Sequence, residues 1–219
     1  MSYELYGCRR SGSLIIELAL AEIGVPYSVH EIDLETRAQR DASYAAVNPQ
    51  RKVPALVTPE GETLTESAAI VLTLDERHPS AGLLPAPGDR PRAEALRVLM
   101  FVATEIYPIV EINDYPERFA VHDAQAPGVR DRAREIWRKR WRLVEEAISG
   151  NPFLQPDGVT VVDFYIAVVS RWAQQDVWRK AYLPKVERLT AAVAARPVAA
   201  PIWQRHRPQE TPTRFTEAW

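Results

Sequence analysis

The sequence predicts an α/β domain over residues 1–78 and an all-helical domain over residues 91–219, joined by a linker over residues 79–90. Strand-like and helix-like patterns alternate in the first third of the chain, which is typical of an α/β domain. The passage around the linker is rich in proline and glycine and lacks periodicity. Every longer pattern after it repeats at helical spacing.

The chain begins with a strand, a helix and a second strand. Residues 3–6 form a short strand pattern, and the stretch from Gly7 to Gly12 is a loop. In residues 14–23 apolar side chains recur at helical spacing, and the glycine and proline that follow this stretch end the helix. Residues 27–33 alternate as a half-buried strand does.

The rest of the first domain completes a known order of elements. Residues 37–46 favour a helix, residues 55–58 and 62–64 form a hairpin, and residues 68–77 form a closing helix. The order β-α-β-α-β-β-α is that of a thioredoxin-like fold. The first domain is therefore predicted to be thioredoxin-like.

The sequence patterns of the second domain predict helices throughout. Pro108 is expected to kink the first of them, because proline cannot donate the backbone hydrogen bond of a helix interior. Thr160 and Asp163 have the spacing of a capping box, which is a structural device. The helices are predicted over residues 93–112, 129–149, 161–175 and 183–195.

Composition and charge exclude several classes of function. The 219 residues carry a net charge of −2 and no long run of lysine and arginine, which disfavours nucleic acid and anionic membranes as partners. No apolar run approaches the length of a membrane span, and the N-terminus lacks a secretory pattern, so we expect a cytoplasmic protein. We also expect no metal. The single cysteine, Cys8, excludes an intramolecular disulfide and a Cys-x-x-Cys redox pair.

Pro54 stands at the start of an apolar strand, in the segment Lys52-Val53-Pro54-Ala55-Leu56. Proline lacks the N–H that a strand needs, so a cis Val53–Pro54 bond that turns the chain is the expected solution. Val53 can then present its backbone N–H and C=O to an extended peptide ligand.

Glu66 and Ser67 stand at the mouth of the helix predicted over residues 68–77. Free N–H groups and the positive end of the helix dipole favour a carboxylate there. Ser67 is expected to hold a carboxylate and Glu66 an ammonium group. An amino acid α-centre carries both charges and fits this pair.

The two segments resemble the glutathione-site motifs of the glutathione S-transferase family, in its bacterial cytosolic form with an active-site serine. The resemblance implies a detoxifying enzyme whose thioredoxin-like domain binds glutathione as co-substrate and whose helical domain supplies most of the second-substrate pocket. It also implies a homodimer. Lys52 would pair with the glycine carboxylate of glutathione. Arg51 departs from the family, because many relatives have glycine there.

Two serines in the first loop are candidates for activating the thiol of glutathione. Lowering a thiol pKa by two units takes roughly 2.7 kcal/mol, which a hydroxyl donor beside a helix N-terminus can supply. We favour Ser11 as the catalytic residue because it lies in the loop, whereas Ser13 is placed to cap the following helix. Both are predicted to contact glutathione, together with Lys52, Val53, Pro54, Glu66 and Ser67.

Cys8 offers a different chemistry. Family members with a cysteine in this loop form a mixed disulfide with glutathione and act as thiol transferases or reductases. Counted back from Gly24, the usual place of that cysteine is Gly12. The sequence therefore favours a transferase that adds the glutathione thiolate to a small apolar electrophile. A Cys8-dependent thiol transferase and a non-catalytic glutathione-binding module remain open as alternatives.

Overall fold

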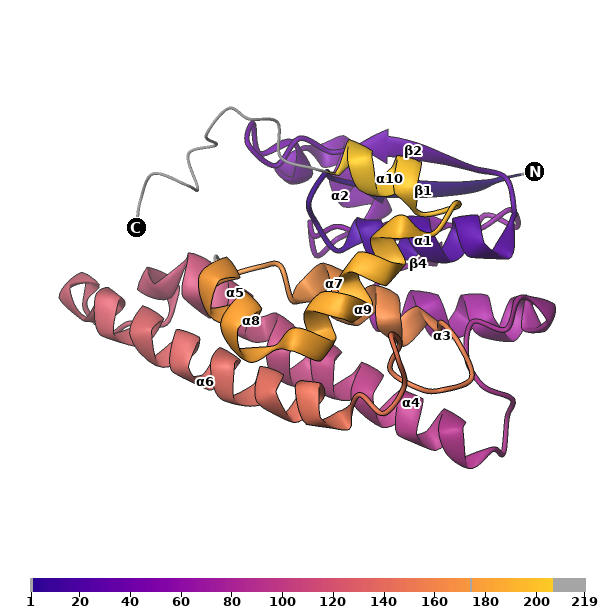
Figure 1. Cartoon of the computed structure of the whole chain (residues 1–219). Helices are drawn as coiled ribbons and strands as arrows, with labels where there is room; N and C mark the ends of the chain where they lie inside the picture. The colour runs from indigo at the N-terminus through magenta and orange to yellow at the C-terminus, as the bar shows by residue number, and fades with distance from the viewer. Residues whose placement is uncertain (1, 174, 207–219) are drawn as a thin grey trace. The chain divides into compact units, whose positions relative to one another are not determined.

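The computed structural model describes residues 2–173 and 175–206 of the chain (Figure 1). These residues form two compact units. The first comprises residues 2–70 and 197–206, and the second comprises the described residues between 71 and 196. Residues 197–206, which the sequence patterns assign to the helical domain, thus belong to the first unit.

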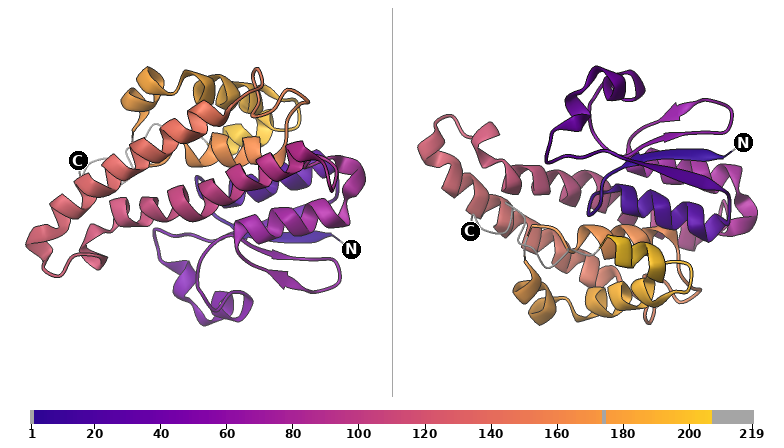
Figure 2. Two further views of the ribbon diagram at one scale, coloured as in Figure 1. Left: turned by 90° about the horizontal axis from the view of Figure 1, so that it is seen from below. Right: turned by 90° about the horizontal axis from the view of Figure 1, so that it is seen from above.

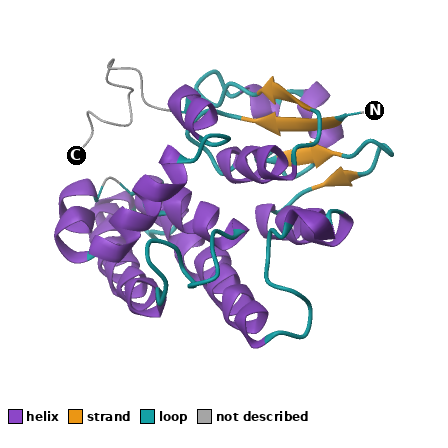
Figure 3. Cartoon of the chain, turned by 45° about the vertical axis from the view of Figure 1, so that its right-hand side comes forward, coloured by secondary structure: helices purple, strands orange, loops and turns teal. Residues whose placement is uncertain are grey.

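A mixed four-stranded sheet organises the first unit (Figure 3). Strand β1 pairs in parallel with β2 and antiparallel with β3, which in turn pairs antiparallel with β4. The spatial order β2-β1-β3-β4 and the helices between the strands confirm the predicted thioredoxin-like domain. The strands are β1 (Tyr3–Gly7), β2 (Tyr27–Glu31), β3 (Ala55–Val57) and β4 (Thr63–Leu64).

Helix α1 (Ser13–Ile23) forms the centre of the first unit. Its residues from Ser13 to Leu20 are all buried, because α1 contacts the sheet through β1 and also contacts the C-terminal helix α10 (Ala200–Arg205) (Figure 2). Gly24 ends α1 in the left-handed conformation, as the sequence predicts. Two further helices follow in the chain, α2 (Ala42–Val47) and α3 (Ser67–Arg77), and α3 crosses the boundary between the units.

The second unit contains only helices among its described regular elements, and its first long helix is interrupted as expected. Helix α4 (Arg90–Phe101) passes into a π-helical segment (Val102–Ile106), and α5 (Tyr107–Asp114) then begins with Pro108 in its first turn. Because Pro108 has no N–H to donate, the helical ladder is re-formed around it. The longest helix is α6 (Ala126–Ala147).

One predicted helix ends early. Helix α7 (Val161–Val169) does not continue to residue 175, and Ala173 has a left-handed backbone with φ of 60°. Helix α8 (Asp176–Tyr182), which the sequence patterns did not predict, follows and leads to α9 (Pro184–Ala195). No helix within the described ranges is both long and apolar enough to cross a membrane.

The predicted capping box begins α7. Asp163 accepts a hydrogen bond from the Thr160 N–H at 2.7 Å with one carboxylate oxygen, and from the Leu154 N–H at 2.7 Å with the other. The Thr160 hydroxyl lies 3.0 Å from the same carboxylate. Asp163 is fully buried, and burial raises the pKa of its carboxyl to about 6 although these hydrogen bonds lower it.

Candidate active site

The strand register gathers the candidate residues at one end of the sheet. Tyr6 of β1 lies opposite Ala55 of β3, and Leu56 of β3 lies opposite Leu64 of β4. The loop after β1, the corner before β3 and the segment after β4 therefore leave the sheet at the same end. These three segments, together with the first residues of α1 and α3, hold every residue that the sequence assigns to the site, namely Ser11, Ser13, Lys52, Val53, Pro54, Glu66 and Ser67.

Each of the three segments contains a non-glycine residue with a left-handed backbone. The φ angles are 65° at Arg10, 57° at Arg51 and 61° at Glu66. Such residues cost on the order of 1–3 kcal/mol and concentrate at ligand-binding sites, where the surrounding structure holds them. Arg51 thus adopts the backbone that a glycine favours, so this departure from the family's glycine keeps the left-handed turn.

The start of α1 packs directly against the end of β1. A Cβ atom at Gly7 would lie 2.5 Å from the Ser13 Cβ, so only glycine fits there. Ser13 is buried, its hydroxyl lies 2.9 Å from the Cys8 carbonyl oxygen, and it accepts the Cys8 N–H at 3.2 Å. The expectation that Ser13 caps α1 is wrong, because its hydroxyl bonds the backbone of Cys8 instead.

Ser11 is half-buried and lies within this hydrogen-bonded loop. Its hydroxyl donates to the Cys8 carbonyl at 2.7 Å, accepts the Ser13 N–H at 3.2 Å and lies 2.9 Å from the Ser13 hydroxyl. A hydroxyl has one proton to donate, so Ser11 must leave the Cys8 carbonyl to donate elsewhere. The Ser13 hydroxyl also donates to that carbonyl, which therefore keeps a partner when Ser11 turns away.

A backbone donor stands beside Ser11. The N–H of Gly12, at the N-cap of α1, has no acceptor among residues 2–173 and 175–206. An unpaired N–H at a helix N-terminus favours a negative charge nearby. The sequence draws attention to the side chains of this loop, because nothing in the sequence shows which N–H groups stay open.

Cys8 lies in surroundings that disfavour its thiolate. The side chain is only partly exposed, and burial raises the pKa of its thiol. A hydrogen bond with the backbone of Leu34 acts against this effect, but the carboxylates of Glu31, Asp33 and Glu35 raise the pKa further. A reactive cysteine needs the opposite environment, with positive charge or donors near the sulfur.

The corner before β3 presents an open stretch of backbone. The Val53–Pro54 bond is cis, as the sequence predicts. Tyr44 and Asn48 each donate a side-chain hydrogen bond of 2.7 Å to the carbonyl of Lys52. The next residue, Val53, is half-buried, and its N–H and C=O bond to nothing within the described part of the chain.

Tyr44 and Asn48 were missed by sequence reasoning. Both side chains are buried, and burial raises the pKa of Tyr44 to about 12, so its phenol stays protonated and remains a donor. Asn48 also accepts the N–H of Gln50 at 3.0 Å. The sequence shows them only as members of a polar stretch before a turn, and no signal links them to the carbonyl four or more residues later.

The segment after β4 leads directly into α3. Ser67 is the first residue of α3, and the exposed Glu66 immediately precedes the helix. The Glu66 carbonyl accepts the N–H of Ile70 at 2.9 Å, which aligns the first turn. A ligand carboxylate at Ser67 would therefore meet the positive end of the helix dipole.

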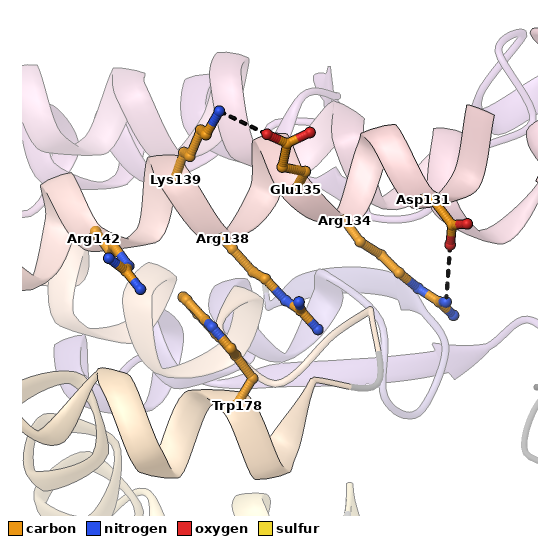
Figure 4. A pocket seen from close by; sticks show the side chains of 7 residues that line it. All are labelled: Asp131, Arg134, Glu135, Arg138, Lys139, Arg142 and Trp178. Carbon is orange, nitrogen blue, oxygen red and sulfur yellow. Dashed lines mark hydrogen bonds and ion pairs between the residues drawn. The ribbon is translucent and has the colours of Figure 1, made fainter. Parts of the chain in front are cut away.

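The second unit has a separate hollow of about 590 Å³ between α6 and α8 (Figure 4). The charged side chains that line this hollow pair mainly with one another or with other side chains of the protein. Lys139 lies 2.7 Å from Glu135, Arg134 lies 3.8 Å from Asp131, and Arg138 donates to the side-chain oxygen of Gln175 at 2.8 Å. None of the predicted site residues lines this hollow.

Within the described ranges, no three His, Cys, Asp or Glu side chains are grouped as metal ligands would be.

Comparisons with known proteins agree with the arrangement of the first unit. The family model of the glutathione S-transferase N-terminal domain matches residues 13–77. The glutathione S-transferase GstA of Escherichia coli O157:H7 is 30% identical over 166 residues, which cover 74% of this chain and 77% of that relative. A maleylacetoacetate isomerase of Rhizobium meliloti is 40% identical over 106 residues, which cover 48% of each protein.

A solved structure shares the fold of nearly the whole chain. The crystal structure of a glutathione transferase homologue from Sulfitobacter, with bound glutathione, superimposes with a TM-score of 0.84 at 24% identity. The match covers 93% of this chain and 98% of that one. By its thioredoxin-like unit, its helical unit and its similarity to GstA, this chain belongs to the glutathione S-transferase family.

Proposed function

We propose that this protein is a glutathione transferase. It binds glutathione across the three segments at the end of the sheet, ionises the thiol with Ser11 as the catalytic residue, and directs the thiolate at a small apolar electrophile. The observation that carries this proposal is the open backbone of Val53, at the same end of the sheet as Ser11 and Ser67. An extended tripeptide is the ligand class that uses such a backbone edge.

Each charged end of glutathione has a partner in this scheme. Val53 pairs with the middle of the tripeptide through its N–H and C=O. Ser67 and the first turn of α3 bind the carboxylate of the γ-glutamyl α-centre, and Glu66 binds its ammonium group. Lys52 is exposed beside Val53 and binds the glycine carboxylate.

The sulfur then lies at the loop that follows β1. As the thiol loses its proton to solvent, the Ser11 hydroxyl turns from the Cys8 carbonyl to the thiolate, and the Ser13 hydroxyl, which already donates to that carbonyl, remains its partner. The Ser11 oxygen keeps accepting the Ser13 N–H, which polarises the hydroxyl and strengthens it as a donor. The N–H of Gly12, which has no acceptor among the residues that the structure describes, is a second donor for the same negative charge.

Two observations separate this proposal from the alternatives. The raised pKa of Cys8 disfavours a thiol transferase that uses this cysteine. A non-catalytic binding module needs the Val53 edge and the Ser67 helix start, but it does not need a second hydroxyl that bonds the Cys8 carbonyl when Ser11 turns away.

A panel of electrophiles assayed with glutathione tests activity directly. It includes maleylacetoacetate, because a relative that matches half of the chain is named as its isomerase.

Ser67→Ala and Glu66→Ala are each expected to weaken glutathione binding. Each change leaves one charged group of the ligand without its partner, which costs about 1.5–3 kcal/mol, or roughly 10- to 150-fold in the dissociation constant. Isothermal titration calorimetry measures this loss. Ser28→Ala, at an exposed serine of β2, is the matched control. Unchanged affinity in a folded Ser67→Ala protein would contradict the proposed site.

The protein is also expected to form a homodimer and to act in the cytoplasm. A groove of about 350 Å³ between α4 and α6 is lined mainly by apolar side chains, with Arg97 and Glu146 also in its lining. Leu143, one of the apolar residues that line it, is 55% exposed. Light scattering at micromolar concentration should give twice the chain mass of 24.7 kDa. Leu143→Glu should shift the mass towards the monomer, whereas Val177→Glu, at an equally apolar exposed position of α8, should not. A monomeric wild type would refute the dimer.

A further inference from the structure

A buried carboxylate in α1 connects the C-terminal helix α10 to the rest of the first unit. Glu17 is 2% exposed, and its oxygens face Arg205, the His206 Nε2 at 2.9 Å and the Tyr27 hydroxyl at 3.3 Å. A buried carboxylate is tolerated only when charged or hydrogen-bonding partners surround it. Two of its three partners come from the end of α10, so Glu17 holds that end in place.

The other nitrogen of the same imidazole bonds the candidate active-site loop. His206 is 7% exposed, and its Nδ1 accepts the backbone N–H of Arg10 at 3.1 Å. Arg10 is the residue with the left-handed backbone in this loop, and the next residue is Ser11. The hydrogen bond from Arg10 to His206 therefore fixes the backbone one residue before the hydroxyl that the proposed reaction uses.

The geometry defines the charge state of the ring. A nitrogen that accepts an N–H carries no proton, so the His206 proton resides on Nε2 and points at Glu17. Burial, together with the positive charges of Arg205 and Arg9, lowers the pKa of His206 to about 4, against the opposing effect of Glu31. The ring therefore stays neutral, and stays an acceptor for Arg10, throughout the neutral range.

We propose that His206 is a positioning residue for the thiolate of glutathione: by holding the Arg10 backbone in its left-handed conformation, it directs the Ser11 hydroxyl and the Gly12 N–H at the sulfur. This inference rests on the proposed function. Without His206 Nδ1 as acceptor, the exposed Arg10 can return to a right-handed backbone. The Ser11 hydroxyl and the Gly12 N–H would then no longer point at the same place. In this role His206 acts through the Arg10 backbone and not by touching glutathione or the electrophile.

Two substitutions separate the two nitrogens of the ring. In His206→Asn the amide oxygen falls near the place of Nδ1 and can still accept the Arg10 N–H, but the bond to Glu17 is lost. In His206→Gln the amide reaches the place of Nε2 and still donates to Glu17, but Arg10 has no acceptor. If His206 were only structural, the variant with the larger loss of stability would also show the larger loss of activity. That variant is His206→Asn, because it breaks the bond to the buried Glu17.

The experiment measures thiolate absorbance of bound glutathione against pH, turnover and the free energy of unfolding in each variant. We expect His206→Gln to raise the thiol pKa and to lower turnover at neutral pH about tenfold, the upper range for one hydrogen bond. We expect His206→Asn to stay within about twofold of wild type although it is the less stable protein. His30→Gln, at a half-exposed histidine of β2, is the control.

A second readout needs no glutathione. The Arg10 amide should exchange with deuterium slowly in wild type and His206→Asn, and faster in His206→Gln. Equal exchange in all three proteins would refute the bond, and equal thiolate titrations in proteins that differ in exchange would refute the positioning role. If the wild type forms no glutathione thiolate at all, the proposed function fails and the positioning role fails with it, whereas the amide exchange still judges the bond to His206.

Discussion

Replacing Asp163 with alanine is expected to lower the free energy of unfolding by about 2–4 kcal/mol at pH 7, because the N–H groups of Leu154 and Thr160 lose their acceptors. Both bonds are buried, so water cannot replace the carboxylate. Chemical denaturation of the purified protein measures the change. Asp131→Ala, at an exposed acidic residue of α6, is the control.

The same carboxylate gives this prediction a pH dependence. The folded pKa of about 6 lies above the unfolded value of about 3.9, so the folded state holds the proton more tightly. The stability from this preference is present below the unfolded pKa and is lost as pH rises through 6. Asp163→Asn, which cannot ionise, should lack this loss between pH 4 and 7. An identical pH dependence in Asp163→Asn and wild type would contradict the assignment.

Ser11→Ala is expected to reduce turnover with glutathione about 100-fold at neutral pH, as a shift of two units in the thiol pKa implies. Affinity for glutathione should change little, because the lost interaction is made with the ionised sulfur, whereas binding uses Val53, Glu66 and Ser67. The thiolate absorbance of bound glutathione against pH measures the shift. Ser11→Thr keeps the hydroxyl and should retain most of the activity.

Cys8→Ala is the control for this experiment and should leave the titration and the conjugation rate unchanged. If Cys8 were the working residue, its removal would abolish glutathione-dependent disulfide reduction, and mass spectrometry of wild type would show a glutathione adduct on Cys8. An unchanged titration in Ser11→Ala would instead assign the thiolate to backbone donors, first of all the Gly12 N–H.

The parts of the fold that the sequence predicts are those that local residues determine. Gly24 and Pro26 end α1 wherever that helix packs, and Pro108 interrupts its helix regardless of the neighbours. The end of α7 was predicted wrongly: the helix ends at Val169, and Ala173, inside the predicted helical stretch, takes a left-handed backbone. Apolar periodicity reports which side chains are buried, and the buried Ser170 and Ala173 show that burial continues beyond the end of the helix.

In the candidate site, too, the sequence predicts the parts that neighbouring residues determine and misses those that depend on the folded chain. The segments around Pro54 and Ser67 carry their geometry in neighbouring residues, so a short motif was enough to find them. The bond between Arg10 and His206 joins residues 196 positions apart, and each looks in the sequence like an ordinary surface side chain. Sequence patterns report local preference, whereas such a pair depends on how α10 returns to α1 in the folded chain.

The contact between Gly7 and Ser13 limits how this active site can evolve. Because the two ends of the loop touch, insertions or larger side chains at these ends would separate β1 from α1. The side chains of Cys8 and Ser11 take no part in that contact, and the Ser13 hydroxyl bonds the backbone of Cys8 rather than its thiol. New reactivity can therefore arise by exchanging single side chains inside a loop of fixed length, which lets one scaffold move between thiol chemistries without refolding.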